Sequence, residues 1–61
     1  MSRLVPAPDA LVGSRFDVAV SQMLGISRAK AADLIESGQA RVLDRAIAKS
    51  GTLLYGETVE F

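Results

Sequence analysis

The sequence predicts a single small domain of the α+β class, in which two short helices pack on a small, mostly antiparallel sheet. Apolar residues recur at helical spacing in two consecutive segments between residues 14 and 38. From Gln39 onward the apolar pattern changes to a period of two, which is typical of strands. A chain of 61 residues, of which 49% are hydrophobic, has enough apolar side chains for one core.

The N-terminal segment predicts an extended arm followed by a loop. Residues 2–6 favour a short strand or arm, which Pro6 and Pro8 stop because proline cannot donate to a strand ladder. Residues 7–13 favour a loop, with Asp9 and Gly13 as turn residues. We therefore divide the chain into an N-terminal strand or arm and loop, residues 1–13, and a domain that spans residues 14–61.

The first helix is predicted to begin after Ser14. The Ser14 hydroxyl would cap the helix, and the carboxylate of Asp17, three residues later, would complete a capping box. Gly25 would end the helix, because glycine readily adopts the left-handed conformation found there. The predicted buried stripe consists of Phe16, Ala19, Val20, Met23 and Leu24.

A second helix is predicted directly after the first. Ser27 is its expected N-cap, and Gly38 supplies the C-terminal stop. The expected buried face consists of Ala31, Leu34 and Ile35.

The remaining residues predict a small sheet. Residues 40–43 favour a strand, Asp44 and Arg45 a tight turn, and residues 46–48 a returning strand. Residues 49–54 are expected to be irregular, and Tyr55 to Glu57 to turn the chain into a last strand at 58–61. Tyr55 could stack on a base, but packing against the sheet is the favoured interpretation.

Composition excludes several classes of function. The chain has no cysteine and no histidine, which excludes disulfides and the usual zinc sites. No group of residues has the spacing of a catalytic, metal or cofactor site, and capping explains Asp17 without chemistry. We therefore expect no enzymatic activity from this chain alone, and no metal or cofactor. The N-terminus has no signal-peptide pattern and no segment could span a membrane, so we expect a cytoplasmic location.

The distribution of charge points to nucleic acid, although Lys and Arg together number 7 and so do Asp and Glu. Arg28 and Lys30 fall in the first turn of the second helix, and Arg15 lies at the start of the first. Cations there oppose the helix dipole at a cost of roughly 0.3–1 kcal/mol each, and this arrangement suits an external anion such as phosphate. We expect these cations to be uncompensated and to share one surface. Each of these cations also has an interpretation without a ligand. A lysine or arginine can be a solvated surface charge, which we favour for Arg45, and Arg15 can pair with an acidic side chain.

Several short motifs, taken in order, resemble the S-four RNA-binding domain (the alpha-L motif), named for the ribosomal small-subunit protein that contains it. The resemblance covers roughly residues 14–61 and implies two helices on a small sheet that bind structured ribosomal RNA through phosphates. The residues that carry it are Arg15-Phe16-Asp17, Gly25-Ile26-Ser27-Arg28, Ala31, Leu34-Ile35, Gly38, Arg41-Val42, Lys49, Gly56-Glu57 and Val59. The predicted RNA-binding residues are Arg15, Ser27, Arg28, Lys30, Arg41 and Lys49.

The extended arm, together with Lys49-Ser50, looks most like the N-terminal domain of large-subunit ribosomal RNA pseudouridine synthases. In that family the catalytic aspartate lies in a separate downstream domain, so the chain is expected to be a fragment of a longer protein. Structured ribosomal RNA is then the expected partner, without a membrane or a small-molecule substrate. The alternatives are an S-four domain of another protein that modifies ribosomal RNA or associates with the ribosome, and a protein-interaction module, which zero net charge favours.

Overall fold

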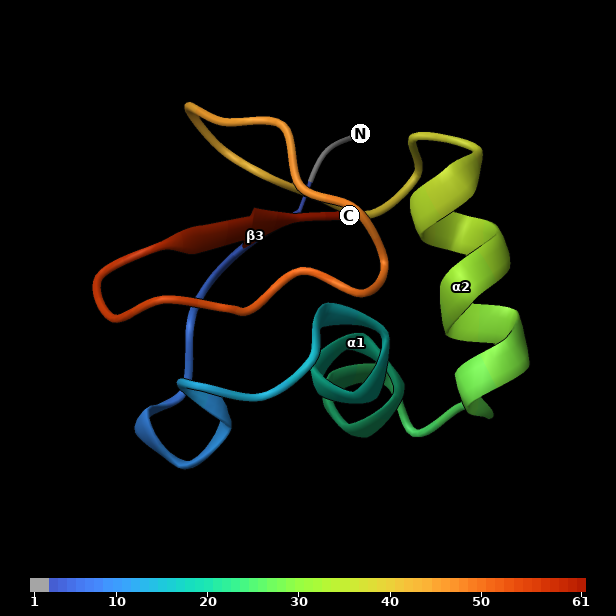
Figure 1. Ribbon diagram of the computed structural model, residues 1–61, viewed down its shortest axis with the longest axis horizontal. Helices are drawn as coiled ribbons and strands as arrows, with labels where there is room; N and C mark the ends of the chain where they lie inside the picture. Colours follow the sequence, from blue (N-terminus) through green and yellow to red (C-terminus); the bar gives the residue numbers. More distant parts are fainter. Residues whose placement is uncertain (1–2) are drawn as a thin grey trace.

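The computed structural model describes residues 3–61, and it confirms the predicted α+β class: two helices (Figure 1) pack with a three-stranded antiparallel sheet. The part of the expected first strand that falls on Ser2 lies outside the described residues. The elements are β1 (Leu4–Pro6), the 3₁₀ turn η1 (Asp9–Leu11), α1 (Phe16–Leu24), α2 (Arg28–Glu36), β2 (Arg41–Val42) and β3 (Thr58–Glu60).

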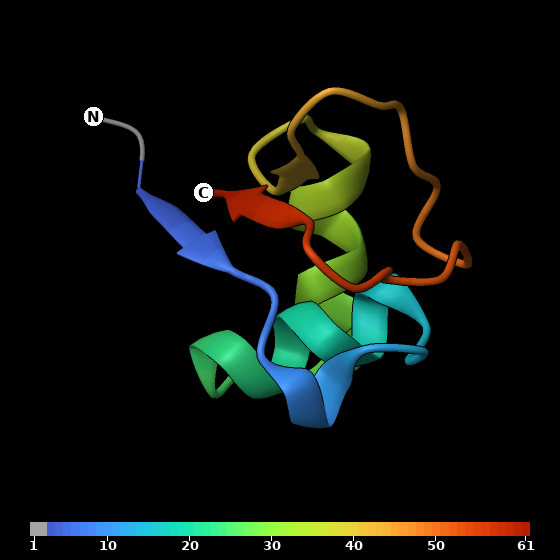
Figure 2. The same ribbon diagram turned by 90° about the vertical axis from the view of Figure 1, so that its left-hand side faces the viewer.

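The sheet has the strand order β1-β3-β2, so the last strand of the chain is the central one. β3 runs antiparallel to both neighbours, and Val59 is in register with Val5 of β1 and Val42 of β2. Figure 2 shows β1 and β3 side by side, although they come from opposite ends of the sequence. Val59 is fully buried, whereas Thr58 and Glu60 are only partly covered, as the alternation of a strand requires.

The prediction of a returning strand at residues 46–48 is wrong, because the structure has no strand there. β2 pairs with β3, and the Leu43 N–H continues this pairing by donating to the carbonyl of Thr58. The chain then turns at Asp44, which adopts the left-handed conformation with φ of 71°. The Arg45 guanidinium binds Glu57 and the carbonyl of Thr52, and this holds the loop against residues 52–57. Residues 46–48 form no strand and pair with none of the three strands of the described sheet.

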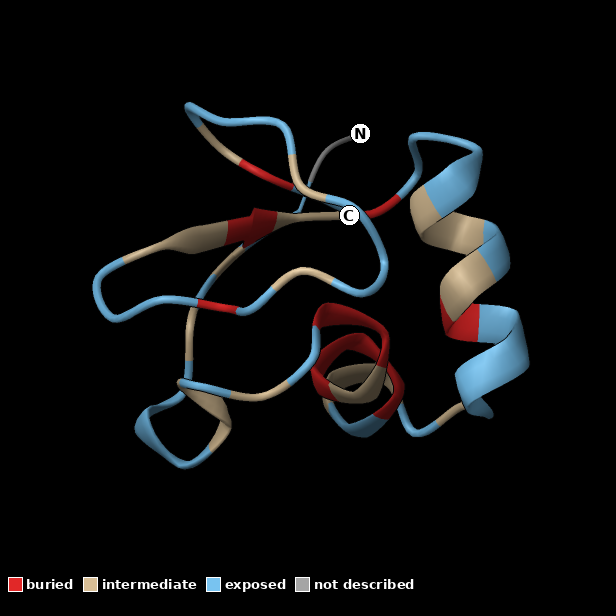
Figure 3. Cartoon of the chain, in the orientation of Figure 1, coloured by how far each residue is buried: buried red, intermediate tan, exposed pale blue. Residues whose placement is uncertain are grey.

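The core lies between the helices and the sheet. Phe16, Ala19 and Val20 of α1 are completely buried, and Ala31 of α2 is buried against them (Figure 3). The other core residues are Ala40, Val42, Leu53 and Val59. Leu53 comes from the segment expected to be irregular, so this loop contributes to the core although it contains no strand.

The link between the helices follows the local sequence closely. Gly25 ends α1 with φ of 67°, and its N–H donates to the carbonyl of Ser21. Ser27 begins α2, and its hydroxyl oxygen accepts a hydrogen bond from the N–H of Lys30 at 3.2 Å. Both predictions are confirmed. The short link places the start of α2 near α1, and this proximity determines the geometry described next.

Candidate nucleic-acid interface

Backbone carbonyls from a loop distant in sequence accept hydrogen bonds from the first N–H groups of α1. The N–H of Phe16 donates to the carbonyl of Gly51 at 2.7 Å, and that of Asp17 to the carbonyl of Lys49 at 3.0 Å. Arg15 is the N-cap residue and its side chain forms no capping hydrogen bond, so the predicted capping box with Ser14 as N-cap is wrong. Because the loop satisfies these N–H groups, the Asp17 carboxylate is available for other contacts.

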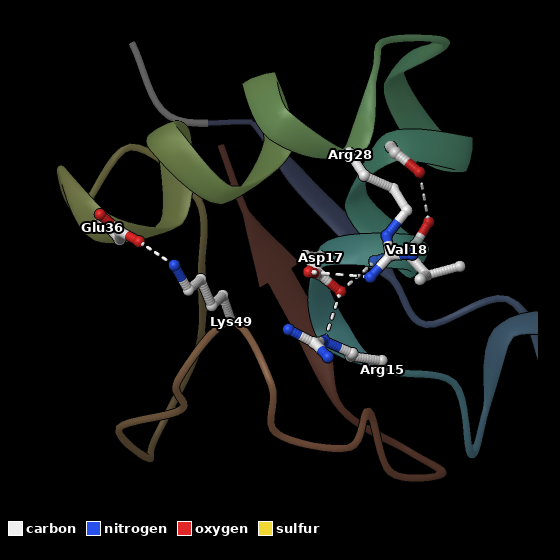
Figure 4. Close-up of polar contacts among 7 residues, drawn as sticks. Arg15, Asp17, Val18, Arg28, Glu36 and Lys49 are labelled. Carbon is white, nitrogen blue, oxygen red and sulfur yellow. Dashed lines mark hydrogen bonds and ion pairs between the residues drawn. The ribbon is translucent and has the colours of Figure 1, made fainter.

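Asp17 is the centre of the site, and its side chain is only 5% exposed. Its Oδ1 accepts a hydrogen bond from the N–H of Val18 at 2.8 Å and lies 3.0 Å from Nε of Arg15. Its Oδ2 lies 3.7 Å from Nη2 of Arg28 (Figure 4). Arg15 directly precedes α1, and Arg28 is the first residue of α2. One buried carboxylate therefore contacts arginines from the starts of both helices. Their side chains stay 47% and 61% exposed, so solvent and ligands still reach them.

Lys49 lies beside this arrangement and is paired with Glu36, at the end of α2 (Figure 4). The hydrogen bond to Glu36 raises the pKa of Lys49, and the positive charge of Arg15 acts in the opposite direction. The main-chain carbonyl of Lys49 accepts the N–H of Asp17 at 3.0 Å, so Lys49 lies next to the residue that both arginines contact. We call Arg15, Arg28 and Lys49 the basic cluster.

Ser27 and Lys30 lie at the exposed start of α2. The Ser27 oxygen accepts the capping bond, and its hydroxyl proton can still donate to a ligand. Lys30 forms no ion pair within residues 3–61, so it matches the expectation of an uncompensated cation. Two positions along a helix correspond to a rotation of about 200°, so Lys30 projects from a different side of α2 than Arg28.

The remaining arginines are held at the sheet. Arg41 pairs with Glu60, the residue directly opposite it on β3. Arg45 uses Nε and Nη2 to bind both carboxylate oxygens of Glu57, which also accepts the N–H of Leu54. The hydrogen bond from Arg45 lowers the pKa of Glu57, and the same bond raises the pKa of Arg45. Arg45 is therefore a structural residue, and its interpretation as a solvated charge is wrong.

The expectation of uncompensated cations is only partly correct. Arg15, Arg28, Arg41 and Lys49 each lie against a carboxylate. The alternative interpretation of Arg15, pairing with an acid, is the one that the structure confirms. An excess of positive charge nevertheless remains in the basic cluster, because Arg15 and Arg28 have a single carboxylate between them.

Sequence reasoning missed two members of the site. Asp17 was interpreted as a capping residue, although its position two residues after Arg15 is compatible with an ion pair. Glu36 gave no signal, because its partner Lys49 is 13 residues away. The favoured packing of Tyr55 against the sheet is also wrong, since this side chain is 82% exposed.

Comparison with known proteins adds a relationship. Two uncharacterized RNA pseudouridine synthases, from Mycobacterium bovis and Mycobacterium tuberculosis, are each 36% identical to the chain over 58 residues. The chain is related to RNA pseudouridine synthases. The match covers 95% of the chain, which spans only 19% of the length of these relatives. No protein-family model matches the chain, and no solved structure matches it significantly.

The relationship to RNA pseudouridine synthases agrees with the parent family expected from the sequence motifs. The RNA-binding role of the six predicted residues stays a prediction. Within residues 3–61, neither of the two α-helices has the length and apolar character needed to cross a membrane.

Proposed function

We propose that residues 14–61 form an S-four-like module that binds structured ribosomal RNA through its phosphates. We further propose that the module is the N-terminal, RNA-targeting part of a pseudouridine synthase, whose catalytic aspartate lies in another domain. The chain alone would then bind RNA without modifying it. Its contribution to catalysis would be to raise the local concentration of RNA at the tethered catalytic domain.

The observation that carries this proposal is the convergence of three cations from three separate segments. Arg15 precedes α1, Arg28 begins α2, and Lys49 lies in the loop that closes the start of α1. All three side chains are about half exposed or more. Phosphates along an RNA strand present a row of anions, and guanidinium groups bind such oxygens through more than one hydrogen bond. A folded RNA therefore fits this surface better than an isolated anion does.

The mode of recognition follows from the chemistry of the surface. The major groove of A-form RNA is too deep and narrow for side chains to read, so phosphate positions and shape dominate. Ser27, at the exposed start of α2, would extend the contact beyond the basic cluster. Lys30 projects from another side of the helix than Arg28, so it would contact the RNA only where the RNA also passes around this end of α2. Arg41 would contribute from the sheet if RNA competes successfully with Glu60 for its guanidinium.

Arg28→Gln tests the proposal, with Arg3→Gln as its matched control. Both changes remove one exposed arginine charge, but Arg3 precedes β1 and forms no ion pair within the described part of the chain. Binding of a labelled RNA hairpin is measured by fluorescence anisotropy from about 50 to 200 mM salt. Circular dichroism verifies that both variants are folded.

Arg28→Gln should weaken binding roughly three- to tenfold at low salt. It should also reduce the slope of log affinity against log salt by about 0.7–0.9, the loss of one phosphate contact. Arg3→Gln should do neither, and an unstructured oligonucleotide should bind less tightly than the hairpin. Equal effects of the two substitutions would contradict the proposal. Binding of a protein partner without salt dependence, and of no RNA, would instead support an interaction module.

A further inference from the structure

The two carboxylates beside the basic cluster are held very differently. Asp17 is 5% exposed and contacts the Val18 N–H, Arg15 and Arg28. Glu36 is 57% exposed, and Lys49 is its partner among the described residues. Asp17 is therefore a fixed part of the fold, whereas Glu36 is free to leave its partner.

Competition for Lys49 follows from this difference. An ion pair between two half-exposed side chains contributes little, because water screens the charges and both side chains lose rotamer freedom. A phosphate of a bound RNA would meet Lys49 next to Asp17 and the two arginines that contact it. Its contact with Lys49 restricts one protein side chain, whereas the ion pair with Glu36 restricts two. The phosphate therefore has the advantage over the carboxylate.

We infer that Glu36 is a built-in competitor of RNA: its carboxylate occupies Lys49 in the free protein and is displaced by an RNA phosphate. The inference rests on the proposed function and assigns to Glu36 the role of lowering the affinity of the site. Asp17 stays in place during this exchange and continues to hold both arginines.

The backbone around Lys49 makes such an exchange local. The carbonyl of Lys49 accepts the N–H of Asp17 at 3.0 Å, which fixes the main chain of Lys49 at the start of α1. Only the lysine side chain and the Glu36 side chain then have to move, on the time scale of rotamer changes at an exposed surface. Lys49 is charged at neutral pH whether or not Glu36 is its partner, because the ordinary pKa of a lysine is about 10.4.

Glu36→Gln tests the inference, and Asp33→Asn is its matched control. Asp33 lies one turn earlier on α2, is exposed, and forms no ion pair within residues 3–61. Each substitution removes one negative charge from the same helix. Both are made in the natural chain and in a Lys49→Ala background, so that the double-mutant cycle isolates the coupling between Glu36 and Lys49. The probe is a labelled RNA hairpin at about 50 mM salt.

Glu36→Gln should tighten binding about two- to fivefold in the natural chain, the range expected from an exposed ion pair. Asp33→Asn should change it by about 1.5-fold or less, because its charge is solvated. With Lys49→Ala, the two substitutions should have equal effects.

The inference is overturned if Glu36→Gln weakens binding, if it equals Asp33→Asn in the natural chain, or if its gain persists without Lys49. A natural chain that binds no RNA at this salt would overturn the proposed function together with the inference. If the natural chain binds RNA but the cycle shows no coupling between Glu36 and Lys49, only the inference is overturned.

Discussion

Replacement of Asp17 gives the most direct measure of what holds the two helix starts together. Asp17→Ala removes the acceptor of the Val18 N–H and the carboxylate shared by Arg15 and Arg28. Asp17→Asn keeps an oxygen of nearly the same position and shape, and removes only the charge. The two variants therefore separate the hydrogen bond from the ion pairs.

The expected magnitudes follow from exposure. The arginine side chains are 47% and 61% exposed, so each ion pair contributes only about 0.2–1 kcal/mol. Neither arginine is left as a buried unpaired charge, which avoids the larger penalty seen in dry interiors. Asp17→Asn should therefore lower the free energy of unfolding by about 1 kcal/mol. Asp17→Ala also leaves a partly buried N–H without its acceptor, for a total of about 2–3 kcal/mol.

Thermal unfolding followed by circular dichroism measures both values. In a domain of this size, about 1 kcal/mol corresponds to a shift of roughly 4–8 °C in Tm. Asp33→Ala, at an exposed position of α2, should change the free energy by less than about 0.5 kcal/mol. In about 1 M salt the cost of Asp17→Asn should shrink, because only the ionic contribution is screened. If Asp17→Asn proved as damaging as Asp17→Ala, or if salt had no effect, the division between hydrogen bond and ion pairs would be wrong.

Two further predictions concern stability. Ser27→Ala should lower Tm by roughly 4–8 °C, because it removes the cap that accepts the Lys30 N–H and costs about 1 kcal/mol; an unchanged Tm would contradict the cap. The hydrogen bond from Arg45 lowers the pKa of Glu57 below its ordinary value of 4.5, so this stabilisation is present above that pH and is lost as pH falls through the folded-state pKa. The Tm difference between the natural chain and Glu57→Gln should therefore be largest near neutral pH and should shrink as pH falls below 4.5. A difference independent of pH would refute the assignment.

The features that sequence predicted correctly depend on near neighbours in the chain. The stripe of α1 follows from apolar spacing over a few turns, and residues such as Phe16 and Val20 are buried as expected. Gly25 and Ser27 act within one helical turn of themselves, through a left-handed conformation and a capping hydroxyl. Such effects operate whatever the rest of the chain does, so the sequence reports them directly.

Most of the errors concern partners that are distant in sequence. The first N–H groups of α1 bind carbonyls of Lys49 and Gly51, which made a side-chain cap by Ser14 unnecessary. The strand β2 pairs with β3, near the end of the chain. The sequence pattern instead predicts a partner for it only a few residues away, at 46–48. Several nearly equivalent backbone pairings are open to such short segments, and packing of the whole core selects among them.

The amino-acid order alone determined that this protein has two helices separated by a glycine stop and a serine cap, a small sheet and cations concentrated near helix starts, because apolar periodicity, the Gly25 stop and the Ser27 cap depend on neighbouring residues. Only the tertiary structure decided which carboxylate each cation meets. Asp17 lies beside Arg28, and Glu36 beside Lys49, because the short link between the helices and the closing loop bring those segments together. Electrostatic energy depends on distance in space, and that distance exists only once the core has formed.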